Sequence, residues 1–455
     1  MTRIFISTLG TNDYEECNYV FDNDKEKTYQ SRFIQEVTIR HFCKNWDSNK
    51  GDRICILCTK GDGGAKKKNW MDNGQFEKDE HGPLTKKPKT CRGLESTLNE
   101  MIKEADYSKL NIIDSCIEIN DGKNTDEIWS IFDAIYSRIE DGDEVYFDIT
   151  HAFRSIPMLI MVVIPYAKVL KNITIANITY GAFDARDSKT KEVPVFNLTD
   201  FVKLMDWTSA AKEFVDYGKT ASLKTLINMD NEPVLKATKG TDKTAQILKK
   251  SMRGIEEFAA SIFTNNLQEI YNFNIKPSVE ELKKENENNI KIKPFVPLIE
   301  KITKKVSCFN RNDWSNVFEA TQWCVNHEMY QNAYSILLEG IISISLEQVG
   351  EPSDKKSGFR KLPVNAAEVV RKSERNLIES REENIQDLND KEKEICEKIC
   401  GIYSKEIAQK ICNLNSYRNS YMHAGTGEPI PRDVTKKISE YKEILETWWA
   451  SLPTK

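Results

Sequence analysis

The sequence lacks a membrane-spanning stretch, a secretory signal and a disulfide framework. Its best apolar stretch, Ile156–Leu170, is cut by Pro165 and stays below the roughly 18 apolar residues of a spanning helix. The opening apolar run meets Gly10 after about six residues, too few for the core of a signal peptide. The 11 cysteines are odd in number and irregularly spaced. We therefore expect a cytoplasmic protein that has no contact with membranes.

Metal-binding and dinucleotide-binding patterns are also missing. Cys55 and Cys58 have CxxC spacing, but they lie in a predicted buried strand, and no second pair follows at zinc spacing. Cys396 and Cys400 lie one helical turn apart without His or Cys neighbours. Neither a GxGxxG fingerprint nor a P-loop occurs. We expect no metal site and no cofactor.

Charge of one sign is not in excess either. The net charge of −5 over 455 residues gives no global electrostatic reason to bind nucleic acid. Any RNA site must therefore be a local basic pocket. The length allows two or three domains, each with a core of its own.

Residues 1–200 alternate short apolar runs with amphipathic stretches. We predict strands at Arg3–Leu9, Arg53–Thr59, Ile112–Ile119, Glu144–Ile149, Ile173–Tyr180 and Val193–Asn197. Between them we predict helices that include Ser31–Cys43, Gly93–Glu104, Asp126–Ile139 and Ser155–Leu170. This alternation predicts an α/β domain with a mainly parallel, Rossmann-like sheet. The polar segment Gly61–Pro88 is predicted to be a long loop at the edge where ligands bind.

Residues 201–455 lose the strand signal, and an all-α domain is predicted there. The helical stretches are Asp200–Tyr217, Lys243–Leu267, Asp313–Asn326, Met329–Gln348 and Asp433–Ala450. Val279–Lys293 and Ser373–Glu397 are dense in Glu, Lys and Asn, which indicates solvated helices or mobile connections.

Two loops of the predicted sheet carry candidate ligand-binding residues. The first strand ends in small and hydroxyl residues, which let a ligand approach the backbone closely: Thr8, Gly10, Thr11 and Asn12. The strand at Glu144–Ile149 is followed by Thr150, His151 and Arg154, where a helix begins. These three side chains suit a phosphate or a base. Alternatively, Thr150 or Ser155 merely caps the helix and His151 is a solvated loop residue.

Near the C-terminal end, Arg418, Asn419 and His423 form an Arg-Asn-x-x-x-His element after an apolar helical run. A His can move a proton to or from ribose and leaving-group oxygens, and an Arg can hold the scissile phosphate. A pair on a helix surface without function is the alternative. On an ideal helix, five residues advance about 500°, so the Arg and His side chains point roughly 140° apart. Two copies facing each other would bring both types of side chain to one phosphate, as would an irregular helix start.

Five segments together point to a known family: Phe5–Asn12, Asp148–Pro157, Val193–Phe214, Trp323–Ser343 and Arg418–Gly425. With these segments in this order, the chain resembles the CRISPR-associated CARF–HEPN ribonucleases of type III systems. The resemblance implies that residues 1–200 form a CARF domain, which binds a cyclic oligoadenylate (tetra- or hexa-adenylate) across the interface of a homodimer or higher homo-oligomer. It also implies that residues 201–455 hold a helical linker and a HEPN ribonuclease domain.

On this resemblance, Arg418, Asn419 and His423 cut single-stranded RNA without a metal and leave a 2′,3′-cyclic phosphate, in antiviral defence. The messenger contacts would be the two loops named above. Ala152 stands where the family often has Gly. Two alternatives remain open: a CARF domain that itself degrades the messenger, and a non-catalytic, ligand-sensing regulator. The intact pair of Arg418 and His423 disfavours the second.

Overall fold

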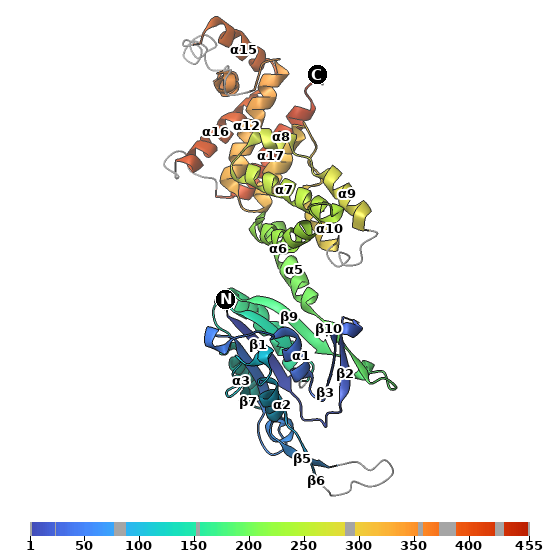
Figure 1. Cartoon of the computed structure of the whole chain (residues 1–455). Helices are drawn as coiled ribbons and strands as arrows, with labels where there is room; N and C mark the ends of the chain where they lie inside the picture. The colour runs from blue at the N-terminus through green and yellow to red at the C-terminus, as the bar shows by residue number, and fades with distance from the viewer. Residues whose placement is uncertain are drawn as a thin grey trace. The chain divides into compact units, whose positions relative to one another are not determined.

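The computed structural model shows two compact units, Met1–Lys203 and Leu204–Lys455 (Figure 1). The residues that the structure describes are 2–22, 24–76, 88–151, 155–286, 296–353, 358–372, 388–423 and 432–453. The division falls inside helix α5 (Thr199–Tyr217), which begins in the first unit and continues into the second.

The first unit is built on an eight-stranded sheet in the order β3-β2-β10-β9-β8-β1-β4-β7. The strands are β1 (Arg3–Leu9), β2 (Cys17–Phe21), β3 (Thr28–Ser31), β4 (Arg53–Thr59), β7 (Cys116–Ile119), β8 (Glu144–Asp148), β9 (Thr174–Gly181) and β10 (Glu192–Asn197). Strand β1 pairs in parallel with β4 and β8, and β4 with β7 and β8 with β9 are parallel too. Strands β10 and β2 are parallel as well, and among the described strands of this sheet only the pairs β10–β9 and β2–β3 are antiparallel. The predicted α/β fold with a mainly parallel sheet is confirmed.

Helices cover both faces of this sheet, as the alternation of side chains along β1 requires (Figure 1). Ile4 and Ile6 pack with α3 (Thr125–Tyr136) and α4 (Ser155–Lys171) on one face. On the other face, Phe5 and Leu9 pack with side chains that include those of α1 (Ile34–Phe42) and α2 (Leu94–Met101). Both faces of β1 are therefore core, and the strand is uniformly apolar apart from its ends and the polar Ser7 and Thr8.

Three parts of the first unit differ from the predictions. The strand at Ile112–Ile119 is shorter and begins at Cys116, because Ile113 and Asp114 form an exposed turn. Strands β2 and β3 were not predicted. The segment Gly61–Pro88 is not simply a loop: it contains a π-helical turn, η3 (Lys66–Trp70), and β5 (Asn73–Phe76), which pairs with β6 (Pro88–Cys91). Residues 77–87 lie outside the described residues.

The second unit contains helices and no strand among its described residues, as predicted for the C-terminal region. After α5 its helices are α6 (Ala221–Ala237), α7 (Lys243–Phe263), α8 (Leu267–Asn272), α9 (Lys276–Asn286), α10 (Val296–Val306), α11 (Ser315–Asn326), α12 (Tyr330–Gln348), α13 (Leu362–Lys372), α15 (Asp390–Cys400), α16 (Lys405–Met422) and α17 (Val434–Ala450). Helices α9 and α15 lie in the two segments rich in Glu, Lys and Asn. Helices α6, α8, α10 and α13 were not predicted.

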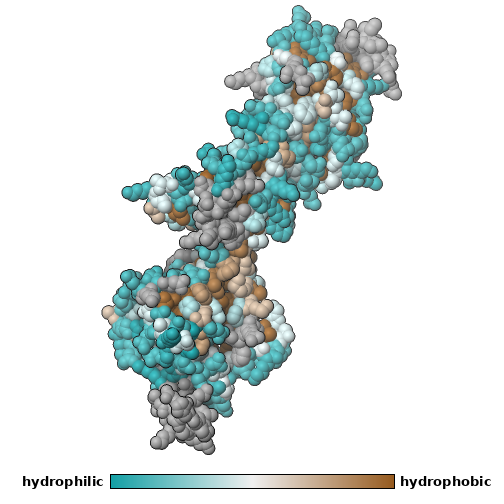
Figure 2. Space-filling view, turned by 90° about the vertical axis from the view of Figure 1, so that its right-hand side faces the viewer, coloured by the Kyte–Doolittle hydropathy of each residue, from teal (hydrophilic) through white to brown (hydrophobic). Residues whose placement is uncertain are grey.

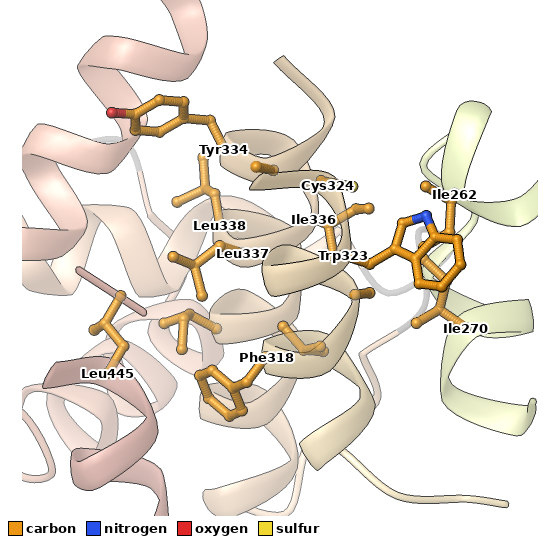
Figure 3. Close-up of a cluster of buried hydrophobic side chains, with 14 of the residues drawn as sticks. Ile262, Ile270, Phe318, Trp323, Cys324, Tyr334, Ile336, Leu337, Leu338 and Leu445 are labelled. Atoms are coloured by element: carbon orange, nitrogen blue, oxygen red, sulfur yellow. The ribbon is translucent and has the colours of Figure 1, made fainter. Parts of the chain in front are cut away.

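Helices α11 and α12 form the centre of the second unit. Figure 3 shows their buried side chains between α7 and α8 on one side and α17 on the other. Gly340 on α12 lets the two helices pack closely at this point, since a Cβ there would lie 2.3 Å from Cγ1 of Val317 on α11. This contact fixes α12 against α11, and with it the side chains that α12 presents on its other faces.

Candidate functional sites

The candidate ligand site lies where the strand order of the sheet reverses. From β1 the chain proceeds to β4 and β7 on one side, and β8 and β9 lie on the other. In open parallel sheets, the loops leaving such a point diverge and form a crevice beyond the carboxyl ends of the strands. The structure has a pocket of about 270 Å³ at this place. Its lining residues are Thr8, Leu9, Gly10, Thr11, Asn12, Tyr14, Leu57, Thr59, Ile119, Thr150, His151 and Ile156.

The loop after β1 is held in shape by two side chains. The backbone N–H of Gly10 donates to the hydroxyl of Tyr14 at 2.7 Å. A Cβ at Gly10 would lie 2.7 Å from that same oxygen, so a side chain here would have to displace the Tyr14 hydroxyl. Nδ2 of Asn69 donates to the carbonyls of Gly10 and Asn12, each at 2.9 Å. Asn69 lies in η3 and is 1% exposed.

The loop after β8 is held by the buried carboxylate of Asp148, the last residue of that strand. Oδ1 of Asp148 accepts from the hydroxyl of Thr150 at 2.5 Å and from its backbone N–H at 3.1 Å, while Oδ2 accepts from Ser7 at 2.6 Å. The Thr150 oxygen in turn accepts from the backbone N–H of Gly181 at 2.8 Å. Burial raises the pKa of Asp148, and the bonds from Ser7 and Thr150 partly offset that rise. The Thr150 hydroxyl thus ties together the ends of β8 and β9.

His151 stands between two pockets. A second pocket of about 230 Å³ shares Asn12, Tyr14, Thr150 and His151 with the first and extends toward Tyr180–Asp184. The His151 ring lies against Tyr14, with 4.5 Å between the ring centroids. Burial lowers the pKa of His151 to about 4, so its imidazole is neutral near pH 7. The alternative of a solvated loop residue is therefore wrong for His151.

Two polar atoms at the pocket have no hydrogen-bond partner among the described residues. They are Nε2 of His151 and Oγ1 of Thr8, both buried. Buried polar groups are almost always paired, so such atoms beside a cavity indicate a place where a ligand completes the bonding. Arg154, the remaining predicted ligand residue, lies outside the described residues, as do Ala152 and Phe153.

The other predicted site lies at the end of α16. Ser404 caps the start of this helix by accepting from the backbone N–H of Ile407. Nη1 of Arg418 donates to Oδ1 of Asn419 at 3.0 Å, which brings two of the three predicted residues together. His423 directly follows the last helical residue, Met422, and is exposed, and its backbone N–H donates to the carbonyl of Asn419.

A groove of about 720 Å³ runs along the Arg418 side of this helix. Its lining residues are Thr264, Asn265, Asn266, Leu267, Gln268, Trp314, Ser335, Glu339, Ser343, Ser353, Arg360, Arg418 and Met422. His423 is not among them, in keeping with the angle between residues 418 and 423 on a regular helix. Nη2 of Arg418 donates to Oε1 of Glu339 on α12 at 2.8 Å. Sequence reasoning did not single out Glu339 or Arg360.

Two further properties concern the described residues as a whole. Their His, Cys, Asp and Glu side chains form no group of three or more that could hold a metal ion. None of their helices is both long enough and apolar enough to cross a membrane.

Both units of the chain are similar to parts of known proteins. Residues 4–184 match the family described as the CARF domain of CRISPR system endoribonuclease Csx1. Residues 203–311 match the second domain of CRISPR-associated protein MJ1674. The CRISPR-associated protein MJ1674 of Methanocaldococcus jannaschii is 24% identical to this chain over 392 aligned residues. The alignment covers 78% of this chain and 56% of the relative. The chain thus spans little more than half the length of that relative.

The first match contains both pockets and the loops that shape them. Arg418 and Glu339 lie beyond both family matches. On the sheet topology, the pocket at its switch point and these matches, the first unit is a CARF domain, and the chain is similar to CRISPR-associated proteins.

Proposed function

We propose that this protein is an endoribonuclease of CRISPR antiviral defence that cuts single-stranded RNA when a cyclic oligoadenylate binds its CARF domain. The observation that carries the sensing half is the pair of unpartnered polar atoms, on Thr8 and His151, at a pocket without a charged lining side chain among the described residues. Neutral donors, acceptors and the Tyr14 ring suit adenine bases and ribose hydroxyls. The Csx1 description of the matching family supports the nuclease half.

Two copies of the chain fit this proposal better than one. The pockets of about 270 and 230 Å³ are each below the roughly 300–1,000 Å³ that encloses a drug-sized ligand, and a ring of four or six adenylates is far larger. Helix α4 exposes large apolar side chains at helical spacing, among them Met158 (73%), Val162 (58%) and Val169 (79%). Figure 2 shows where apolar side chains reach the surface on one side of the molecule. A second copy against α4 would bury this face and complete a messenger site.

The chemistry requires no metal. The ribose 2′-oxygen attacks the adjacent phosphorus as its proton passes to a base, and the 5′-oxygen leaves with a proton from an acid. The products are a 2′,3′-cyclic phosphate and a 5′-hydroxyl. His423 supplies the proton transfer and Arg418 stabilises the charge on the phosphate. Because these side chains point to different sides of α16, His423 of one copy and Arg418 of a second copy would share a phosphate.

A second candidate is breakdown of the messenger within the CARF domain. The neutral imidazole of His151, with a buried and unpartnered Nε2, is a group that could accept the proton of a messenger 2′-hydroxyl. A purely ligand-sensing regulator, without either cleavage, is the remaining alternative.

One experiment separates the three. The purified full-length chain is mixed with a fluorogenic single-stranded RNA, with cyclic tetra-adenylate, cyclic hexa-adenylate or neither, in excess EDTA, and the messenger is followed by chromatography. We expect RNA cleavage with one messenger only, and a cyclic phosphate on the upstream fragment. Loss of messenger would establish the second candidate. Messenger binding without cleavage of either molecule would leave the regulator.

A further inference from the structure

Glu339 lies at the centre of the groove wall formed by α12. Ser335, Glu339 and Ser343 are four residues apart and form one stripe of this helix along the groove. The close packing of Gly340 against α11 fixes the rotation of α12, and therefore the direction of this stripe. Glu339 is the acidic member of the stripe, and its side chain is 31% exposed.

The carboxylate of Glu339 is shared by two arginines. Oε1 accepts from Nη2 of Arg418, at 2.8 Å, and Oε2 accepts from Nη2 of Arg360, at 2.5 Å. Arg360 belongs to the short 3-10 helix η8 (Phe359–Lys361), which leads into α13. Both guanidinium groups border the groove, with 29% of Arg418 and 21% of Arg360 exposed.

The two arginines are held very differently. The Nη atoms of Arg360 also donate to the Ser343 hydroxyl at 3.1 Å, the Ser353 carbonyl at 2.5 Å and the Glu339 carbonyl at 3.2 Å. Together with the bond to Oε2 of Glu339, these three bonds engage all four N–H groups on its Nη atoms, so Arg360 is held in place. Toward the described residues, Arg418 uses one N–H of each Nη, donating to Asn419 and Glu339. Its guanidinium therefore keeps N–H groups for a ligand in the groove.

We propose that Glu339 is a positioning residue, which Arg360 fixes and which in turn holds the Arg418 guanidinium at the groove wall to receive an RNA phosphate. The role rests on the proposed ribonuclease function. Two guanidinium groups and one carboxylate leave a net positive charge at this wall, as binding of a phosphate requires. A carboxylate that oriented Arg418 would act on the reaction rate, because misplacement of a catalytic group by about 1 Å can cost on the order of a hundredfold.

The test compares Glu339→Gln with wild type in the full-length, messenger-activated protein. The substitution keeps the volume and one acceptor but removes the charge. We expect kcat for RNA to fall roughly tenfold to a hundredfold, with KM changed less than about threefold. Melting temperature and messenger affinity should remain those of wild type. Glu446→Gln is the matched control, since Glu446 is 38% exposed and pairs with Lys442 on α17, away from the groove lining.

The alternative outcomes each decide the matter. A Glu339→Gln protein with wild-type kcat would overturn the positioning role. Faster cleavage with a lower KM would overturn it too, because Glu339 would then be a counter-ion that competes with RNA. If the Gln variant unfolds, Glu339→Asp keeps the charge on a shorter side chain and should give an intermediate kcat, whereas a wild-type kcat would reject the proposal. A wild-type protein that cuts no RNA with either messenger would overturn the proposed function itself.

Discussion

The pocket of the α/β unit and the groove of the helical unit differ in the charge of the polar side chains that line them. Around the pocket, burial keeps His151 neutral and a hydrogen-bond network encloses Asp148, while two polar atoms find no partner in the described part of the chain. Around the groove, two arginines form ion pairs with one shared carboxylate. The first arrangement suits a ligand read by hydrogen bonds and stacking, and the second suits a phosphate chain. Each prediction below tests one side of this contrast.

The largest effect is expected at the helical unit. His423→Ala should reduce messenger-activated RNA cleavage by roughly 10²–10⁴-fold, the usual range for loss of a general acid or base. Messenger affinity should not change, because the residue lies far along the chain from the CARF domain. Initial rates and calorimetry on the same protein measure both quantities. A variant that cuts within a few-fold of wild type would remove His423 from the chemistry.

The next effect concerns assembly of the α/β unit. Val162→Glu places a charge in the exposed apolar face of α4, and we expect monomers in sedimentation and RNA cleavage no faster than without messenger. Ile113→Glu is the control, since Ile113 is also apolar, 83% exposed, and lies in the turn before β7 rather than on α4. A fully active Val162→Glu monomer would contradict the shared site.

The same contrast explains what could be predicted from the sequence. Strands β1 and β4 were predicted with their observed bounds, because both are mostly apolar, are buried at every position after the first and end at glycine-containing loops. The loop residues Gly10–Asn12 and His151 followed from the rule that ligands bind beyond the ends of parallel strands. Strands β2 and β3 were missed, because they are short and joined by charged residues. The π-helical turn was not predicted, because its sequence, Lys66–Trp70, begins with three lysines and looks like a polar loop.

The network around Arg418 could not be predicted in this way. Glu339 and Arg418 are 79 positions apart, and Arg360 is a further 21 positions from Glu339 along the chain. A glutamate on an apolar helix carries no local sign of its partner, since the contact depends on how α12 packs against α16. Asn69 is a similar case, 59 positions from the Gly10 carbonyl that it binds. The roles of Arg418, Asn419 and His423 remain predictions.

A smaller effect is expected for the loop after β1. Gly10→Ala should weaken messenger binding about tenfold, because its Cβ would displace the Tyr14 hydroxyl and break a part-buried hydrogen bond worth on the order of 1–2 kcal/mol. Cleavage at saturating messenger should change much less. Gly63→Ala is the control, since a Cβ at Gly63 meets no atom within 4 Å. Calorimetric titration with messenger checks both variants, and equal affinities would show that the loop does not shape the site.

The smallest effect concerns the pH dependence of stability that the neutral His151 creates. In the unfolded chain His151 takes up a proton as pH falls through its ordinary pKa of 6.5. In the folded protein the pKa of His151 is about 4, so the imidazole stays neutral until the pH approaches that value. Between these values the unfolded state binds more protons, so this contribution to stability is complete above pH 6.5 and is lost as pH falls toward 4. In His151→Gln the contribution is absent. Its melting temperature should therefore fall less than that of wild type between pH 7 and pH 4.5, by about a few degrees. The buried Asp148 titrates in both proteins and cancels in the difference. Equal changes in melting temperature for the two proteins would mean that His151 is not held neutral by burial, and the contrast between an uncharged pocket and a charged groove would lose its first half.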